Sequence, residues 1–158
     1  MEGGAAVANN RYEAPVTIAG EHLDTEFSRA DIEFEGVDHS GASYEGRVFL
    51  NNPRADATTP LTPENGYAGT FHIFGHGGCF ADDEEHCTVR PRRRYDPRPA
   101  HQLTPARKVV IATEAVRQAL ETGPAVTVRV VPVVRATTPK AGPEDVFSYE
   151  RVSIVTYR

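Results

Sequence analysis

Short segments of alternating apolar and polar residues run through the chain, and this period of two is typical of half-buried β-strands. Residues 29–37 show it clearly, because acidic residues separate Ala30, Ile32 and Phe34. Pro132 follows a valine-rich segment and is expected at a sheet edge or a bulge, since proline has no backbone N–H to donate. The same pattern predicts further strands over residues 44–51, 67–74, 108–112, 126–130 and 147–157.

One segment, residues 113–122, has the apolar spacing of a helix face and a length of about three turns. Thr113 is the expected N-cap, and Gly123 followed by Pro124 ends the segment. The 12 Pro and 13 Gly are spread along the chain, which favours many short strands over long helices. We therefore predict a mainly β fold, an antiparallel β-sandwich of about six to eight strands with one short α-helix.

The length of 158 residues fits one domain of ordinary size. Residues 1–28 begin with small and polar positions, and we expect them to form an N-terminal tail that is partly extended. Residues 29–158 are expected to form the β-sandwich domain. The sequence shows no internal repeat that would suggest a different organisation.

The charge balance changes which partners we expect. Lys and Arg number 17 against 22 Asp and Glu, so the net charge is -5 and nucleic acid is an unsuitable main partner. The longest apolar runs are far shorter than the roughly 20 residues of a spanning helix, so we expect no membrane insertion. The N-terminus has no basic and apolar leader. We expect a cytoplasmic protein, with export alongside a partner left open.

The densest chemistry lies in residues 71–87, which contain His72, His76, Cys79, His86 and Cys87. Imidazole and thiolate are natural ligands of zinc and copper, and thiolate favours Cu(I) or Zn. Three glycines between the first histidine and the first cysteine allow the tight backbone path that would bring such ligands together. These five residues are the candidate metal ligands.

Other interpretations of the same block remain open. Cys79 and Cys87 are separated by seven residues, so a disulfide would clamp an exposed loop. The two cysteines are alternatively buried free thiols. His72 lies between Phe71 and Ile73 on a predicted strand, and alternation would then point its side chain to solvent.

Residues 44–53 (YEGRVFLNNP), 66–80 (GYAGTFHIFGHGGCF) and 86–87 (HC) resemble the β-sandwich domain that follows the catalytic domain in tyrosinases and polyphenol oxidases of bacteria and plants. Residues 152–157 (VSIVTY) resemble the closing strand of that domain. The resemblance covers roughly residues 29–158. It implies a β-sandwich from the type-3 copper protein family.

In that family, six histidines on helices of the preceding domain hold the dicopper centre. This chain has six histidines, none of them in the predicted helix, so no catalytic residue is assigned. The family's sandwich domain packs on the catalytic domain and shields its copper. The resemblance therefore implies an accessory subunit or detached cap for a tyrosinase-like copper oxidase, with copper bound directly or through the partner.

On this hypothesis Phe80 is the candidate plug for the copper pocket, and Tyr67 and Phe74 supply docking area. The five histidine and cysteine ligands would assist copper loading. One alternative is a small stand-alone oxidoreductase that uses copper or another metal at His72, His76 and His86. A second alternative is a structural β-sandwich with a disulfide-clamped loop.

Overall fold

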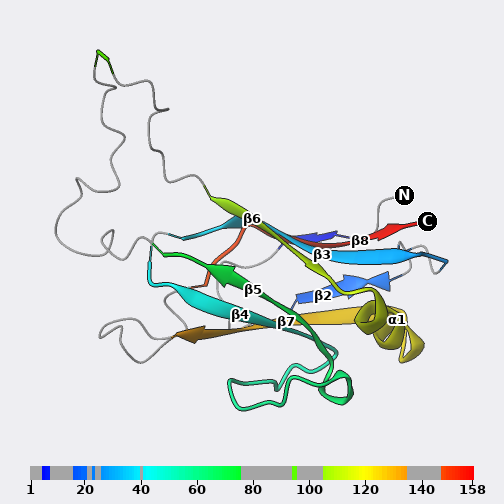
Figure 1. Ribbon diagram of the computed structural model, residues 1–158. Coiled ribbons are helices and arrows are strands. Elements are labelled where there is room, and N and C mark those ends of the chain that lie inside the picture. Colours follow the sequence, from blue (N-terminus) through cyan, green and yellow to red (C-terminus); the bar gives the residue numbers. More distant parts are fainter. Residues whose placement is uncertain are drawn as a thin grey trace.

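The computed structural model is a sandwich of two antiparallel β-sheets (Figure 1). It describes residues 5–7, 16–20, 23, 26–39, 41–75, 94–95, 105–134 and 147–158. Sheet A has the strand order β1-β8-β3-β6, and sheet B has the order β2-β7-β4-β5. The strands are β1 (Ala5–Val7), β2 (Val16–Ala19), β3 (Arg29–Val37), β4 (Tyr44–Leu50), β5 (Tyr67–Ile73), β6 (Ala106–Ile111), β7 (Ala125–Val134) and β8 (Arg151–Tyr157), and the helix is α1 (Thr113–Glu121). The predicted mainly β sandwich with one short helix is confirmed.

The period of two along β3 places one set of its side chains in the core between the sheets. Ala30, Ile32 and Phe34 are fully buried, and Val152 and Ile154 of β8 are buried beside them. Burying such side chains is worth roughly 1.5–3 kcal/mol each, so this alternation specifies which face of sheet A meets sheet B.

The core is aromatic at one end of the sandwich. The ring of Phe34 lies 5.2 Å from Phe71 and 5.6 Å from Tyr149, measured between centroids, and Phe147 packs on Tyr149 at 4.9 Å. Burial raises the pKa of Tyr149 to about 12, and burial with the nearby Asp38 charge raises the pKa of Tyr44 further. Sheet A and sheet B are thus joined here through ring contacts.

The last strand is shorter than predicted. Residues 147–150 do not continue β8, whose pairing with β3 ends where Arg151 lies opposite Glu35, next to Gly36 at a φ of 66°. The backbone there still bonds to β3, since the Glu150 N–H donates to the Glu35 carbonyl at 2.9 Å. Phe147 and Tyr149, which precede β8, are both buried in the core.

Strand β7 shows why Pro132 is tolerated in a sheet. Residues 125–128 of β7 pair with β2 and residues 128–134, including Pro132, pair with β4, so among the described strands Pro132 has a partner on one side alone. Pro132 therefore needs no N–H for a second neighbour, as expected for an edge position.

Helix α1 closes one end of the sandwich and begins differently from the prediction. The N-cap is Ala112, without a side-chain cap, and the prediction of Thr113 as the cap is wrong. The Thr113 hydroxyl instead accepts a hydrogen bond from the Ala30 N–H at 3.1 Å. The threonine thus joins the helix to β3, a tertiary use that local sequence does not reveal. Among the described residues, α1 is too short and too polar to cross a membrane.

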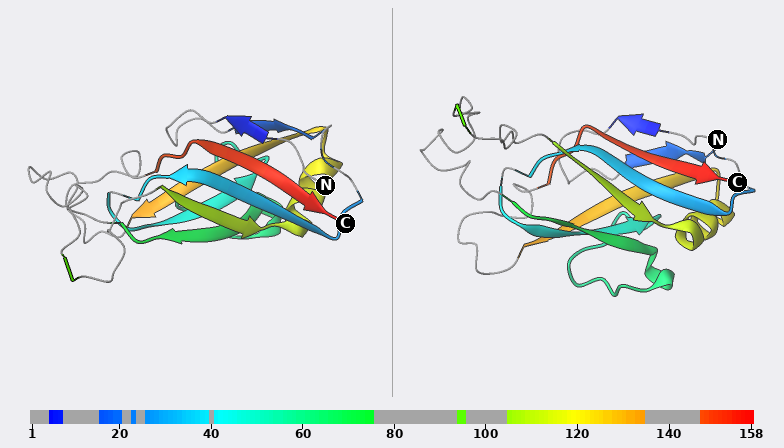
Figure 2. Two further views of the ribbon diagram at one scale, coloured as in Figure 1. Left: turned by 90° about the horizontal axis from the view of Figure 1, so that it is seen from above. Right: turned by 45° about the horizontal axis from the view of Figure 1, so that its top comes forward.

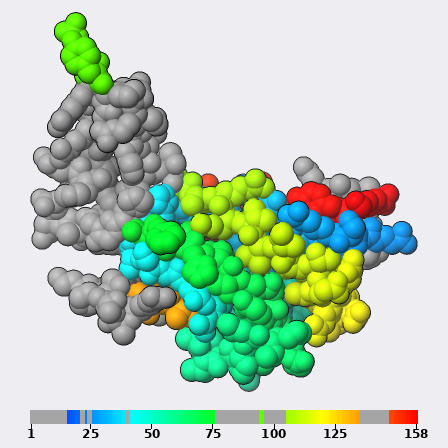
Figure 3. All heavy atoms as spheres, in the orientation of Figure 1, coloured from blue at the N-terminus to red at the C-terminus, as the bar shows by residue number. Residues whose placement is uncertain are grey.

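The strands β5 and β6 are the outermost strands of sheets B and A on one side of the molecule, and they lie next to each other (Figure 3). Gly69 of β5 has a φ of 147°, and a Cβ there would meet the Val110 side chain at 2.5 Å. Glycine at this position therefore permits the close approach of the two sheets.

Candidate functional site

The strand β5 carries the one candidate metal ligand that the structure describes. Phe71 and Ile73 are buried in the core, whereas the His72 side chain lies on the outer face of sheet B with an exposed fraction of 68%. The neighbouring strand places Glu45 opposite, and the His72 Nε2 lies 4.0 Å from the Glu45 Oε2. The alternation on β5 thus directs His72 to solvent.

His72 has a carboxylate neighbour, and that carboxylate is already engaged. The Glu45 Oε1 accepts a hydrogen bond from the Arg47 Nε at 2.7 Å. Within the described ranges, no group of three or more His, Cys, Asp or Glu side chains is arranged to hold a metal ion. His76, Cys79, His86 and Cys87 lie outside the described residues, as does Phe80. The metal, disulfide and plug assignments therefore stay predictions.

The end of β5 is fixed tightly to the turn before β4. The Gly75 N–H donates to the Ser43 Oγ at 2.9 Å, and a Cβ on Gly75 would lie 2.0 Å from the Gly41 carbonyl oxygen. Any other residue at position 75 would push the two segments apart. Phe74, between this contact and β5, has an exposed fraction of 86%. The Phe74 ring is therefore exposed to solvent, while the contacts of Gly75 fix the backbone beside it.

Tyr67, the other candidate docking aromatic, is half-buried at the start of β5. Its ring packs against Phe49 with centroids 5.8 Å apart, and its hydroxyl shares a hydrogen bond of 2.7 Å with the Thr70 Oγ1. Tyr67 therefore takes part in a small apolar cluster on the outer face of sheet B.

That cluster lies beneath the segment of residues 51–66, which we call the cover segment. Phe49, Ala55 and Val131 form the buried centre of the apolar cluster. The Arg129 Nε donates to the Ala55 carbonyl at 2.6 Å, and the Arg47 Nη1 donates to the Ala57 carbonyl at 3.1 Å. The cover segment thus encloses part of the outer face of sheet B by apolar contact and by arginine hydrogen bonds.

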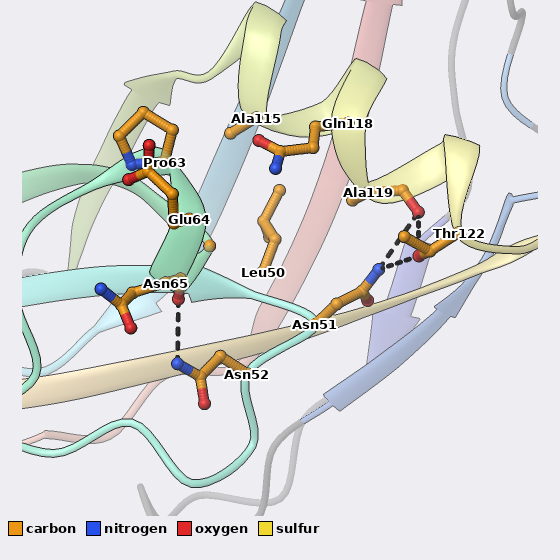
Figure 4. A pocket seen from close by; sticks show the side chains of 11 residues that line it. Leu50, Asn51, Asn52, Pro63, Glu64, Asn65, Ala115, Gln118, Ala119 and Thr122 are labelled. Atoms are coloured by element: carbon orange, nitrogen blue, oxygen red, sulfur yellow. Dashed lines mark hydrogen bonds between the residues drawn. The ribbon is translucent and has the colours of Figure 1, made fainter.

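A pocket of about 240 Å³ lies between the cover segment and α1 (Figure 4). Asn51 forms one wall of the pocket, and its backbone has a φ of 51°. Its side-chain amide donates to the Ala119 carbonyl at 3.1 Å and to the Thr122 Oγ1 at 2.9 Å. Gln118 extends from α1 over Leu50, and Glu64 lies across the pocket. No sequence motif marks these residues, because only the fold brings them together.

Most polar groups in this pocket already have partners within the chain. The Asn52 amide donates to the Asn65 carbonyl at 2.9 Å, and the Asn65 amide donates to the Thr62 Oγ1 at 2.9 Å. Hydrogen bonds from its own backbone N–H and from Thr62 hold the pKa of Glu64 below its ordinary value. These contacts shape the cover segment, and we assign no ligand to the pocket.

Comparisons with known proteins give a likeness to solved structures. No protein-family model matches the sequence, and no curated protein matches it significantly. Latent aurone synthase, a polyphenol oxidase, from its natural source matches with a TM-score of 0.46 and 16% identity over 96% of this chain and 24% of that chain. The recombinantly expressed latent aurone synthase matches with a TM-score of 0.46 and 18% identity over 98% of this chain and 24% of that chain.

The chain therefore spans about a quarter of the length of these structures. At 16–18% identity, the match transfers no activity, substrate or partner to this chain.

Proposed function

We propose that the chain is an accessory subunit, or a detached cap domain, that associates with a tyrosinase-like copper oxidase, shields its active site and assists its copper loading. The motifs of residues 44–53 and 66–80 support this function through their resemblance to the sandwich domain of that family. The helix α1 has no histidine in its sequence, TEAVRQALE, so helical copper ligands of the family type are assigned to the partner.

Phe74 is the observation that carries this proposal. An aromatic ring that is 86% exposed lies at the end of a core strand, immediately before the glycine-rich block. Burying such a ring at an interface stabilises the complex by roughly 1.5–3 kcal/mol. The contacts of Gly75 with Ser43 and Gly41 already fix the backbone next to the ring, so less conformational entropy is lost on docking. Fixed aromatic anchors of this kind dominate the binding energy of protein interfaces.

Copper transfer is the finer part of the proposal. His72 is exposed on the strand that leads to Phe74, so an imidazole ligand stands beside the proposed docking anchor. His76, Cys79, His86 and Cys87 follow in the sequence and would complete a soft ligand set suited to Cu(I). Phe80 would enter the apolar copper pocket of the partner.

Co-expression with a tyrosinase-like oxidase from the same genome tests the function. We expect the oxidase to contain less copper when this chain is omitted, and therefore to oxidise phenols more slowly once each preparation has been separated from this chain. Phe74→Ala should weaken association by at least about tenfold, whereas Leu61→Ala, which truncates an exposed residue of the cover segment, should not. Equal copper content and activity with and without the chain would refute the proposal.

A further inference from the structure

We call the outer face of sheet A, whose strands are seen from above in Figure 2, the A face, and it carries several exposed apolar side chains. Among the described residues six large hydrophobic side chains are exposed, and three of them, Val109, Ile111 and Tyr157, lie on this face. Their exposed fractions are 42%, 62% and 39%. Isolated exposed apolar residues are ordinary on a protein surface, whereas here Val109 and Ile111 are neighbours on β6 and Tyr157 lies across β3 on the same face.

The centre of the A face is acidic and yet nearly closed to water. Asp31 stands opposite Ile111, and Glu33 stands opposite Val109, in the register of β3 with β6. The side chains of Asp31 and Glu33 have exposed fractions of only 3% and 10%. Carboxylates are rarely buried this far unless they are paired.

Each acid on this face has an arginine of its own. The Arg29 Nε and Nη2 donate to the two oxygens of Asp31 at 2.8 and 2.7 Å, in a bidentate pair.

The Arg107 Nη2 donates to Glu33 at 2.6 Å, and the Arg151 Nη2 donates to Glu35 at 2.6 Å. Three arginines thus balance three carboxylates, and these paired residues of β3, β6 and β8 together carry no net charge. The chain's negative charge of -5 lies elsewhere.

We infer that the A face binds the A face of a second copy of this chain, in a two-fold contact of sheet against sheet. A two-fold interface places the same patch on both sides, so the patch must not repel itself. A face of either sign would do so, whereas the charges of this one balance. Its apolar side chains lie on the edge strand β6 and at Tyr157 of β8, and Arg and Tyr are residue types that interfaces favour. Its charges are satisfied internally, so it offers no countercharge to a charged partner.

The size of the face sets the strength of the dimer. Three strands of about seven residues, spaced about 4.8 Å apart and rising about 3.3 Å per residue, span a projected area of roughly 300–350 Å². Two such faces together present roughly 600–700 Å², which is below the about 1,000 Å² of a stable interface and in the range of weak, transient contacts. We therefore expect a weak, reversible dimer that forms only at high protein concentration, with a dissociation constant of roughly 100 µM or above. This inference does not depend on the accessory role.

Sedimentation equilibrium of the whole chain tests the inference. The apparent mass should rise from 17.3 kDa towards about 35 kDa between about 1 µM and about 1 mM, the range in which a small interface associates. Val109→Lys places two like charges in a two-fold contact and should weaken association by at least about tenfold. Leu61→Lys is the matched control, because Leu61 is exposed to the same 42%, and it should leave association unchanged.

Ile111→Lys repeats the test at the most exposed position of the A face, where a folding defect is least expected. Thermal melting at low concentration confirms that each variant is folded. Association should also change little with salt, since the charges of the face are paired within each copy. A wild-type chain that stays monomeric throughout, or a Val109→Lys dimer as strong as the wild type, would overturn the inference.

Discussion

The outer faces of the two sheets are protected from water in different ways. On sheet B the cover segment folds back over Phe49 and Val131 and makes a second apolar cluster there. On sheet A the outward side chains of β3 are acids, each neutralised by an arginine, while Val109 and Ile111 remain exposed. A sandwich can thus close one face with its own chain and leave the other balanced in charge and available for contact.

The largest expected difference between the faces is in stability. Phe49→Ala removes a fully buried ring beneath the cover segment, and truncations of this kind cost about 3–5 kcal/mol. Tyr157→Ala on the A face removes a side chain that is 39% exposed and should cost about 1 kcal/mol or less. Urea unfolding of both variants measures the free energies. Similar losses would show that the two faces are not organised differently.

The core that both sheets share should respond to alkali. Burial raises the pKa of Tyr149 from 10.0 to about 12, so the folded state keeps a proton that the unfolded chain loses. This contribution to stability is complete below pH 10 and is lost as the pH rises through about 12. Tyr149→Phe should flatten the decline of the melting temperature between these pH values. An identical decline in the variant would show that another group is responsible.

The cover segment depends on how it begins. Asn51 takes a positive φ and donates hydrogen bonds to the end of α1, so Asn51→Ala should cost about 1–2 kcal/mol from the bonds and the backbone together. Asn51→Gly loses the same bonds but accepts the φ, so its loss should be smaller. Chemical denaturation compares the two, and equal losses would exclude a backbone contribution.

The smallest expected effect concerns the paired acids. Asp31→Asn weakens a bidentate ion pair with Arg29, and the Asp31 side chain is 3% exposed. Glu45→Gln weakens the single ion pair with Arg47 on sheet B, and the Glu45 side chain is 32% exposed. The melting temperature should fall more for the first variant, since an unpaired group is more costly when water cannot reach it. The opposite order would mean that Asp31 is less enclosed than the structure indicates.

Alternation of apolar and polar residues was sufficient to predict the β-sandwich, because burial of Ile32 and Phe34 leaves β3 a single orientation. Phe49 lies on the face of β4 opposite Val48 and Leu50, and no pattern in the sequence indicates that the cover segment buries it as well. The N-cap prediction at Thr113 failed because the hydroxyl bonds to a strand distant in sequence. Tertiary contacts of this kind have no local signal.

The candidate site could be predicted only in part, for a similar reason. The period of two on β5 correctly allowed His72 to point to solvent, and the exposure of Phe74 agrees with a docking role without testing it. The pocket lies between the cover segment and α1, and it brings Asn51 together with helix residues from Ala115 to Thr122. These are distant from Asn51 in the sequence, so no motif marks the pocket.

Shielding of the partner is the central claim, and phenol oxidation by a purified, copper-loaded tyrosinase-like oxidase tests it most directly. Adding this chain in stoichiometric amount should lower the oxidase's kcat/KM, and the Phe74→Ala variant should require at least about tenfold more protein for the same inhibition. An unchanged rate, or oxidation of a phenol by this chain alone with metal bound to it, would contradict the account.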